Sequence, residues 1–346
     1  MTASAHILAH CARYPLLQPA DLLKFLHQST FGPGHLVAEN AGGLEFLRQE
    51  AADRMNGEVE PLDGEFCRFH LGLPLSPETL WQCFRLSSEM PAGTTEDLER
   101  RLACSLTLAA ENLLPFSKET LAEAVSLWRA AGFPAQHHSE AFRTAYAPAY
   151  RVVHRSFARL LPLLAAIDEK RQQGHPVLVA LEGGAGSGKS TLGETLRNIY
   201  GCPLLHMDDF FLQPHQRTAE RLAEAGGNLD RERFLEEVLL PCRRGEPIQY
   251  RRYDCQTQTI LPPHEIPPAP LFIIEGSYSC HPDLRQHYDL AVFLDISPHL
   301  QRRRIEARNA PEFAQRFFDT WIPMENRYFD AFQIPASCDL ILEVTP

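Results

Sequence analysis

One stretch, EGGAGSGKST at residues 182–191, constrains the fold of this 346-residue chain more than any other. Residues 183–190 fit the pattern G-x-x-x-x-G-K-[ST], which requires an apolar strand before it and a helix after it. The chain supplies the apolar run PVLVAL ahead of the pattern and a helical run over residues 191–200 behind it. The sequence therefore predicts a strand, a phosphate-binding loop (the P-loop) and a helix, against the alternative of a tight turn that binds nothing.

Glycines in such a loop let successive backbone N–H groups turn toward a phosphate, and the positive end of the following helix adds to the attraction. We expect Lys189 to reach the β and γ phosphates of ATP and the Ser190 hydroxyl to bind Mg²⁺. The predicted ATP-binding residues of the loop are Gly183, Gly184, Ala185, Gly186, Ser187, Gly188, Lys189, Ser190 and Thr191.

The P-loop lies near the middle of the chain, so the residues ahead of it need a separate explanation. Up to about residue 173 the apolar residues recur at helical spacing, and Ser76, Thr94 and Ser117 stand where helix N-caps are expected. The last helix of this half is predicted over about residues 150–171. We therefore predict a mostly α-helical N-terminal domain over residues 1–173, whose role the sequence leaves open between substrate specificity, regulation and dimerisation.

From Pro176 onward short apolar runs alternate with helical stretches. Apolar strands that alternate with helices are typical of a parallel sheet covered on both faces. The predicted fold class is α/β, a P-loop NTPase doubly wound parallel sheet over residues 174–346. Two segments depart from this alternation, a predicted β-hairpin at residues 248–261 and a helix over residues 313–332 that is interrupted at Pro323.

Composition narrows the function classes. The net charge of −11 argues against general nucleic-acid binding, because a phosphate backbone requires a basic face. Nine cysteines without CxxC spacing favour a reducing, cytoplasmic location over disulfides or zinc. The N-terminus lacks the pattern of a secretory signal and the apolar runs are too short for a bilayer, so no membrane association is predicted. Assembly into a homo-oligomer stays open.

Carboxylates follow two of the predicted strands. Asp208 comes directly after PLLHM, at the end of a strand where open α/β sheets bind ligands, and could accept the proton of an attacking hydroxyl and help to hold Mg²⁺. Glu275 ends the strand LFIIE in the form of a Walker B acid. The alternatives are an Asp pair that starts a turn and an ordinary strand that ends in Glu. The run RRRIEAR places Arg304 and Arg308 on one helix face, either toward a triphosphate or as a solvated basic face.

The motifs GGAGSGKST, MDDFF, GGNLDRERF, YRRYDCQTQT, FIIEG, QRRRIEAR and WIPMENRYF occur in this order before CDLILEV. In this order they resemble the uridine kinase, phosphoribulokinase and pantothenate kinase group of P-loop kinases over about residues 175–346. The resemblance implies a five-stranded parallel core, a substrate hairpin and an arginine-bearing lid over ATP. It also implies that Asp208 is the general base and that Ser190 and Glu275 surround Mg²⁺. From the residues themselves, Lys189 is the second catalytic candidate and Asp208 the third metal candidate.

The resemblance further implies a small-molecule hydroxyl acceptor. The candidate acceptor-binding residues are Asp209, Asp230, Tyr253, Gln258 and Arg303. Two positions depart from the uridine kinases, which carry Tyr where Phe211 stands and a base-reading His where Gln258 stands. Because a pocket built to hydrogen-bond one partner discriminates against others, these departures count against uridine as the acceptor.

The first half holds one unusual string, FGPGH at residues 31–35, followed at a distance by His137 and His138. A metal or phosphate site from His35, His137 or His138 has no supporting spacing, so a turn and helix ends are the preferred explanation. The leading hypothesis for the chain is an ATP-dependent, uridine kinase-like small-molecule kinase. The alternatives are a nucleotide-dependent switch without an acceptor and a bifunctional enzyme whose first half has its own activity.

Overall fold

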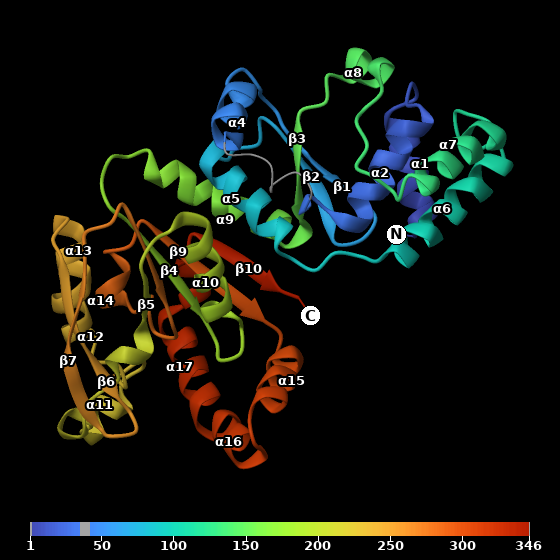
Figure 1. The fold of residues 1–346 in the computed structure, drawn as a ribbon. Helices are drawn as coiled ribbons and strands as arrows, with labels where there is room; N and C mark the ends of the chain where they lie inside the picture. The colour runs from blue at the N-terminus through green and yellow to red at the C-terminus, as the bar shows by residue number, and fades with distance from the viewer. Residues whose placement is uncertain (1, 35–41, 346) are drawn as a thin grey trace. The chain divides into compact units, whose positions relative to one another are not determined.

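The computed structural model describes residues 2–34 and 42–345 (Figure 1). Contacts divide the chain into two units, Met1–Ala165 and Ala166–Pro346. The division falls inside helix α9 (Arg155–Arg171), which both units share. The assignment of residues 1–173 and 174–346 as separate domains stays a prediction.

Helices make up most of the N-terminal unit, as predicted. Three of them begin at the expected caps, because the side chains of Ser76, Thr94 and Ser117 each accept a hydrogen bond from a backbone N–H of the first turn. The helices ahead of α9 are α1 (Ala3–Arg13), α2 (Pro19–Phe31), α4 (Gly43–Ala51), α5 (Pro77–Ser88), α6 (Thr95–Ala110), α7 (Lys118–Ala130) and α8 (Glu140–Tyr146). The FGPGH string begins where α2 ends, and its His35 lies outside the described residues.

The N-terminal unit also contains a sheet that the sequence analysis missed. Strands β1 (Val59–Pro61), β2 (Phe66–His70) and β3 (Tyr150–His154) form an antiparallel sheet in the order β1-β2-β3. The prediction of a helix from residue 150 was therefore wrong for its first turn, and α9 begins at Arg155. The buried β-branched pair Val152 and Val153 suits a strand, and its partner strand lies some eighty residues earlier in the chain, with Cys67 opposite Val153.

The second unit contains the predicted doubly wound sheet. Its five strands are all parallel, in the order β10-β9-β4-β8-β5. The central strand β4 is buried along its whole length, as expected for a sheet covered on both faces. The strands are β4 (Val177–Gly183), β5 (Leu204–His206), β8 (Leu271–Glu275), β9 (Leu290–Ile296) and β10 (Leu340–Val344).

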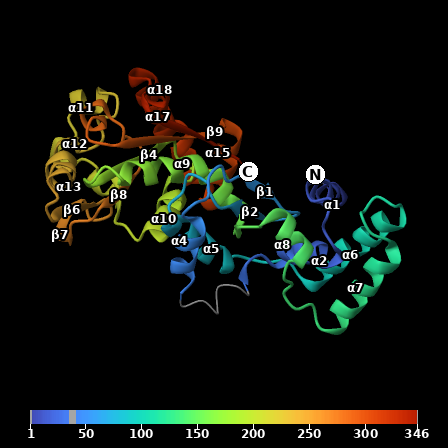
Figure 2. The ribbon, with the colours of Figure 1, turned by 90° about the horizontal axis from the view of Figure 1, so that it is seen from above.

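Helices and a hairpin surround this sheet. The predicted hairpin consists of β6 (Ile248–Asp254) and β7 (Thr259–Ile266), and it is separate from the five-stranded sheet. In Figures 1 and 2 the hairpin and helices α12 and α13 lie together at one end of this unit, and α15 lies at the other. The helices are α10 (Lys189–Tyr200), α11 (Ala219–Ala223), α12 (Arg231–Phe234), α13 (Leu240–Arg244), α14 (Pro282–Arg285), α15 (Pro298–Arg308), α16 (Pro311–Arg316), α17 (Ile322–Phe332) and α18 (Ile334–Ser337).

The irregularity predicted at Pro323 lies a few residues earlier. A π-helical turn, Phe317–Trp321, joins α16 to α17, and Pro323 stands in the first turn of α17. Proline is tolerated in a first helical turn because its missing N–H would have no partner there. Residues 311–332 therefore run as one helical segment with a wide turn in its middle.

Candidate active site

The carboxyl ends of three neighbouring strands place the main side chains of the site. The P-loop follows β4, Glu275 ends β8, and His206 ends β5 directly opposite Glu275 in the sheet register. Because the strands are parallel, all three ends meet at one edge of the sheet, where α/β folds bind ligands. Asp208 lies on the single 3₁₀ turn Met207–Phe210 that follows β5.

The P-loop is held in a shape that only glycine permits at its start. Gly183 has a φ of +144°, and a side chain there would place its Cβ 2.8 Å from the carbonyl oxygen of Leu294. Lys189 begins α10 and curls back over the loop, where its Nζ donates to the carbonyl oxygens of Gly183 at 2.6 Å and Gly184 at 3.1 Å. Two carbonyl acceptors hold the ammonium group beside the loop, where a phosphate oxygen could replace them.

A cavity of about 380 Å³ opens beside the P-loop. It brings together many of the residues predicted from the sequence. Those that line it are Ala185, Gly186, Gly188, Lys189, Ser190, Thr191, Asp208, Glu275 and Arg308. The other predicted ATP-binding residues, Gly183, Gly184, Ser187 and Arg304, lie outside this lining within the described part of the chain.

Ser190, Asp208 and Glu275 present oxygen atoms to the same part of the cavity. The Ser190 hydroxyl donates to both Glu275 carboxylate oxygens at 3.2 Å, and His206 Nδ1 lies 2.7 Å from Glu275 Oε1. Burial, and then the charge of Glu275, raises the pKa of Asp208, whereas the hydrogen bond to Glu275 raises the pKa of His206. A hydroxyl and two carboxylates that repel each other are suitable ligands for Mg²⁺, which would relieve the repulsion.

A family comparison agrees with this arrangement. Residues 178–310 match the model of the Phosphoribulokinase / Uridine kinase family.

Residues 178–310 are therefore similar to that family, and we call them the family domain.

Curated relatives are similar to part of this chain. A phosphoribulokinase from Synechocystis sp. is 24% identical over 179 residues, which cover 49% of this chain and 54% of that protein. Uridine kinase-like protein 3 of Arabidopsis thaliana is 24% identical over 155 residues, which cover 42% of this chain and 33% of that protein. The chain thus spans about half or less of the length of these two relatives.

Solved structures are also similar to about half of this chain. A possible uridine kinase from Bacillus stearothermophilus has a TM-score of 0.40 and 17% identity, covering 52% of this chain and 99% of its own. A putative fructose transport system kinase from Silicibacter sp. has a TM-score of 0.38 and 22% identity, covering 52% of this chain and 97% of its own.

The predicted acceptor-binding residues of the family domain have other partners. Asp230 caps α12 and accepts hydrogen bonds from Arg233 Nε at 3.0 Å and Gln216 Nε2 at 3.1 Å. The Tyr253 hydroxyl accepts from Arg217 at 2.9 Å, and Asp209 accepts from the Tyr250 hydroxyl at 3.3 Å.

The two remaining acceptor candidates are exposed. Gln258 lies in the hairpin turn with a φ of +56°, and Arg303 lies on α15. Among the described residues that line the cavity, none of Asp209, Asp230, Tyr253, Gln258 and Arg303 is found. Their roles therefore stay predictions without support from the cavity geometry.

The two predicted lid arginines are placed differently. Arg304 Nη1 donates to the carbonyl oxygens of Gly186 at 3.2 Å and Ser187 at 3.3 Å, so it braces the P-loop from α15. Arg308 lines the cavity, and its guanidinium carbon lies 5.7 Å from the centre of the Phe317 ring. Of the two, Arg308 is the better placed to reach a phosphate group in the cavity.

The sequence analysis missed part of the cavity wall. These residues are Asn228, Gly276, Ser277, Tyr278, Phe313, Phe317, Trp321 and Glu325, and Phe211 joins them as the position already noted for its departure from the uridine kinases. Glu325 is the least expected, because it is a buried carboxylate beside a site for anions. The motif WIPMENRYF, which contains Glu325, is part of the family resemblance, but the sequence analysis assigned no role to this glutamate.

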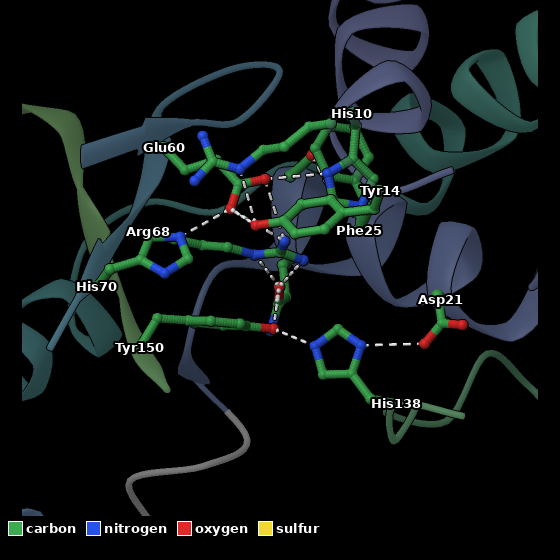
Figure 3. A network of polar contacts seen from close by, with 12 residues as sticks. His10, Tyr14, Asp21, Phe25, Glu60, Arg68, His70, His138 and Tyr150 are labelled. Atoms are coloured by element: carbon green, nitrogen blue, oxygen red, sulfur yellow. Dashed lines mark hydrogen bonds and ion pairs between the residues drawn. The ribbon is translucent and has the colours of Figure 1, made fainter. Parts of the chain in front are cut away.

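Outside the family domain, the N-terminal unit contains a buried cluster of polar side chains (Figure 3). Arg68 is 0% exposed, and it donates to Glu60 and Gln28 while its guanidinium lies 4.5 Å from the centre of the Tyr150 ring. Glu60 also accepts from His10, Tyr14 and His70 at 2.9, 3.1 and 2.9 Å.

His138 extends this cluster to a second carboxylate. Its Nδ1 lies 3.0 Å from Asp21 and its Nε2 lies 2.7 Å from the Tyr150 hydroxyl (Figure 3). Among the described residues, no group of three or more His, Cys, Asp or Glu side chains is arranged to hold a metal ion. Within the same residues, no helix has the length and apolar character needed to cross a bilayer.

Acid is expected to destabilise this unit. Burial lowers the pKa of His10 from 6.5 to about 4, so between these values the unfolded chain binds a proton that the native chain does not. Although burial opposes them, hydrogen bonds from His138 and Ser139 lower the pKa of Asp21 from 3.8 to about 2. Both shifts have the same sign, so the free energy of unfolding should fall as the pH drops below 6.5 and fall further below 3.8.

Urea unfolding followed by tryptophan fluorescence would measure this effect. In a Trp321→Phe background the remaining tryptophans, Trp81 and Trp128, both report on the N-terminal unit. His10→Gln should reduce the slope of stability against pH between 6.5 and 4, whereas the exposed His137→Gln should leave it unchanged. An equal slope in the His10 variant would contradict the assignment.

Proposed function

We propose that residues 174–346 act as an ATP-dependent kinase that transfers the γ-phosphate to a hydroxyl group of a small molecule. The observation that carries the proposal is that the Asp208 carboxylate and the P-loop residues Lys189 and Ser190 line one cavity. A proton acceptor and a phosphate-binding loop are the parts that in-line phosphate transfer requires in the same place.

Each of these residues has a role that its position supports. The backbone N–H groups of the P-loop and Lys189 would hold the β and γ phosphates, and Arg308, which lines the same cavity, would neutralise their charge. Mg²⁺, held by Ser190, Glu275 and Asp208, would supply positive charge at the phosphates. Asp208 would accept the proton of the attacking hydroxyl, and its raised pKa makes it a stronger base than a carboxylate with the ordinary pKa.

The acceptor itself is left open by the cavity. Phe211 lines it, so the departure from the uridine kinases lies within the site, whereas Gln258 lies outside its lining in the described chain. Phe211 offers an apolar face where a tyrosine would offer a hydroxyl, which supports an acceptor other than uridine.

A panel of nucleosides, sugars, sugar phosphates and pantothenate should identify the acceptor by acceptor-dependent release of ADP. We expect at least one compound to be phosphorylated on a hydroxyl group, and Lys189→Met to abolish the reaction, because the phosphates lose their ammonium partner. The product would be identified by mass spectrometry. Nucleotide-dependent binding of a partner, with no phosphorylated compound in the panel, would instead favour a switch protein.

A further inference from the structure

We propose that Glu325 is a positioning residue that holds the P-loop in its phosphate-binding shape. The inference rests on the proposed function, since it concerns the same nucleotide site. Glu325 comes from α17, about 140 residues after the loop that it contacts. Its Oε2 accepts a hydrogen bond from the backbone N–H of Ala185 at 2.9 Å, and its Oε1 accepts from the Ser277 hydroxyl at 2.6 Å.

The two contacts join three segments of the chain. Ser277 follows β8 two residues after Glu275, and its hydroxyl also lies within 3.2 Å of the carbonyl oxygen of Gly183. Glu325 therefore links α17, the P-loop and the segment that carries Glu275.

A second contact of α17 strengthens the attachment. Tyr328 lies one turn after Glu325 on the same helix face, and its hydroxyl donates to Glu182 Oε2 at 3.1 Å. Glu182 precedes the P-loop, is 0% exposed, and accepts from the backbone N–H groups of Gly183 at 2.9 Å and Cys280 at 3.0 Å. One face of α17 thus contacts the P-loop at Ala185 and the residue that precedes the loop, Glu182.

Charge alone would not place a carboxylate here. Glu325 is 6% exposed and lines the cavity beside the P-loop, whose N–H groups and lysine suit an anion, so its negative charge opposes phosphate binding there. Burial of a carboxylate is costly unless hydrogen bonds compensate it, and both oxygens of Glu325 have a donor. Its contribution must therefore come from the geometry that these bonds impose on the loop.

Binding of ATP with Mg²⁺ to the full chain, measured by calorimetry, tests this role. Glu325→Ala should raise the Kd by about tenfold, the factor that corresponds to the loss of a charge-assisted hydrogen bond. Glu325→Gln should stay within about twofold of the unmodified protein, because the amide can still accept from Ala185 and can donate to Ser277. Asp330→Ala, which removes an exposed carboxylate from the same helix, is the matched control and should leave the Kd unchanged.

Ser277→Ala keeps the test valid if Glu325→Ala does not fold. It removes one of the two donors to Glu325 and should also raise the Kd. Where Glu325→Ala does fold, adding Ser277→Ala should change the Kd little further, because both changes break one connection. An unchanged Kd in Glu325→Ala, or a loss in Glu325→Gln as large as in Glu325→Ala, would overturn the positioning role. Failure of the unmodified protein to bind ATP would instead overturn the proposed function.

Discussion

Replacing Asp208 with asparagine is expected to abolish phosphate transfer while leaving ATP binding largely intact. Asp208 lines the cavity with the P-loop, and its carboxylate is the group best placed to accept the proton of an attacking hydroxyl. A positioned general base contributes about 10²–10⁴-fold to a rate, so kcat should fall by at least about 10²-fold. The asparagine keeps the size of the side chain, so the cavity should keep its shape.

Acceptor-dependent ADP release, measured together with the Kd for ATP, separates these effects. Asp295→Asn is the matched control, since Asp295 is exposed at the carboxyl end of β9, on the same edge of the sheet. It should retain kcat and Kd. If Asp208→Asn were fully active, Asp208 would not be the base.

The largest effect on stability is expected from Glu60→Ala in the N-terminal unit. Glu60 is the carboxylate that faces the fully buried Arg68, at 3.2 Å, so its removal leaves a guanidinium without a counter-charge. Breaking a buried ion pair on one side typically costs about 3–5 kcal/mol. The unit should therefore unfold at a much lower urea concentration, which Trp81 and Trp128 would report in the Trp321→Phe background.

Glu58→Ala provides the control for this change. Glu58 lies two residues away and pairs with Arg13, but its side chain is 57% exposed. An exposed pair contributes about 0–1 kcal/mol, so its removal should have little effect. Equal stability of the Glu60 and Glu58 variants would show that the cluster in Figure 3 does not support the fold.

Local sequence patterns predicted most of the second unit correctly. The P-loop, the apolar strands and the hairpin are each encoded by a short continuous stretch. The spacing of apolar residues and the turn residues within each stretch were therefore enough to predict them. The residues that line the cavity together were less predictable. Glu325 meets Ala185 across a separation of 140 residues, and no local pattern records such a contact.

The N-terminal sheet shows the same limit. Strand β2 carries Arg68 at its centre. A charged residue inside a short apolar run interrupts the apolar pattern by which a buried strand is predicted. Its burial becomes understandable only when Glu60 and Gln28 from other elements are present. Conversely, the helix caps at Ser76, Thr94 and Ser117 were predicted because a cap depends only on the next few residues.

The helical segment over residues 311–332 has a consequence for redesign of the site. Phe317 and Trp321 form part of the cavity wall, and Glu325, one turn further along, binds the P-loop. Wall and loop are therefore connected through a single short stretch of backbone. We expect that substitutions of Phe317 or Trp321 chosen to admit a different ligand will also alter the affinity for the nucleotide. Ligand preference and nucleotide affinity would therefore have to be selected together.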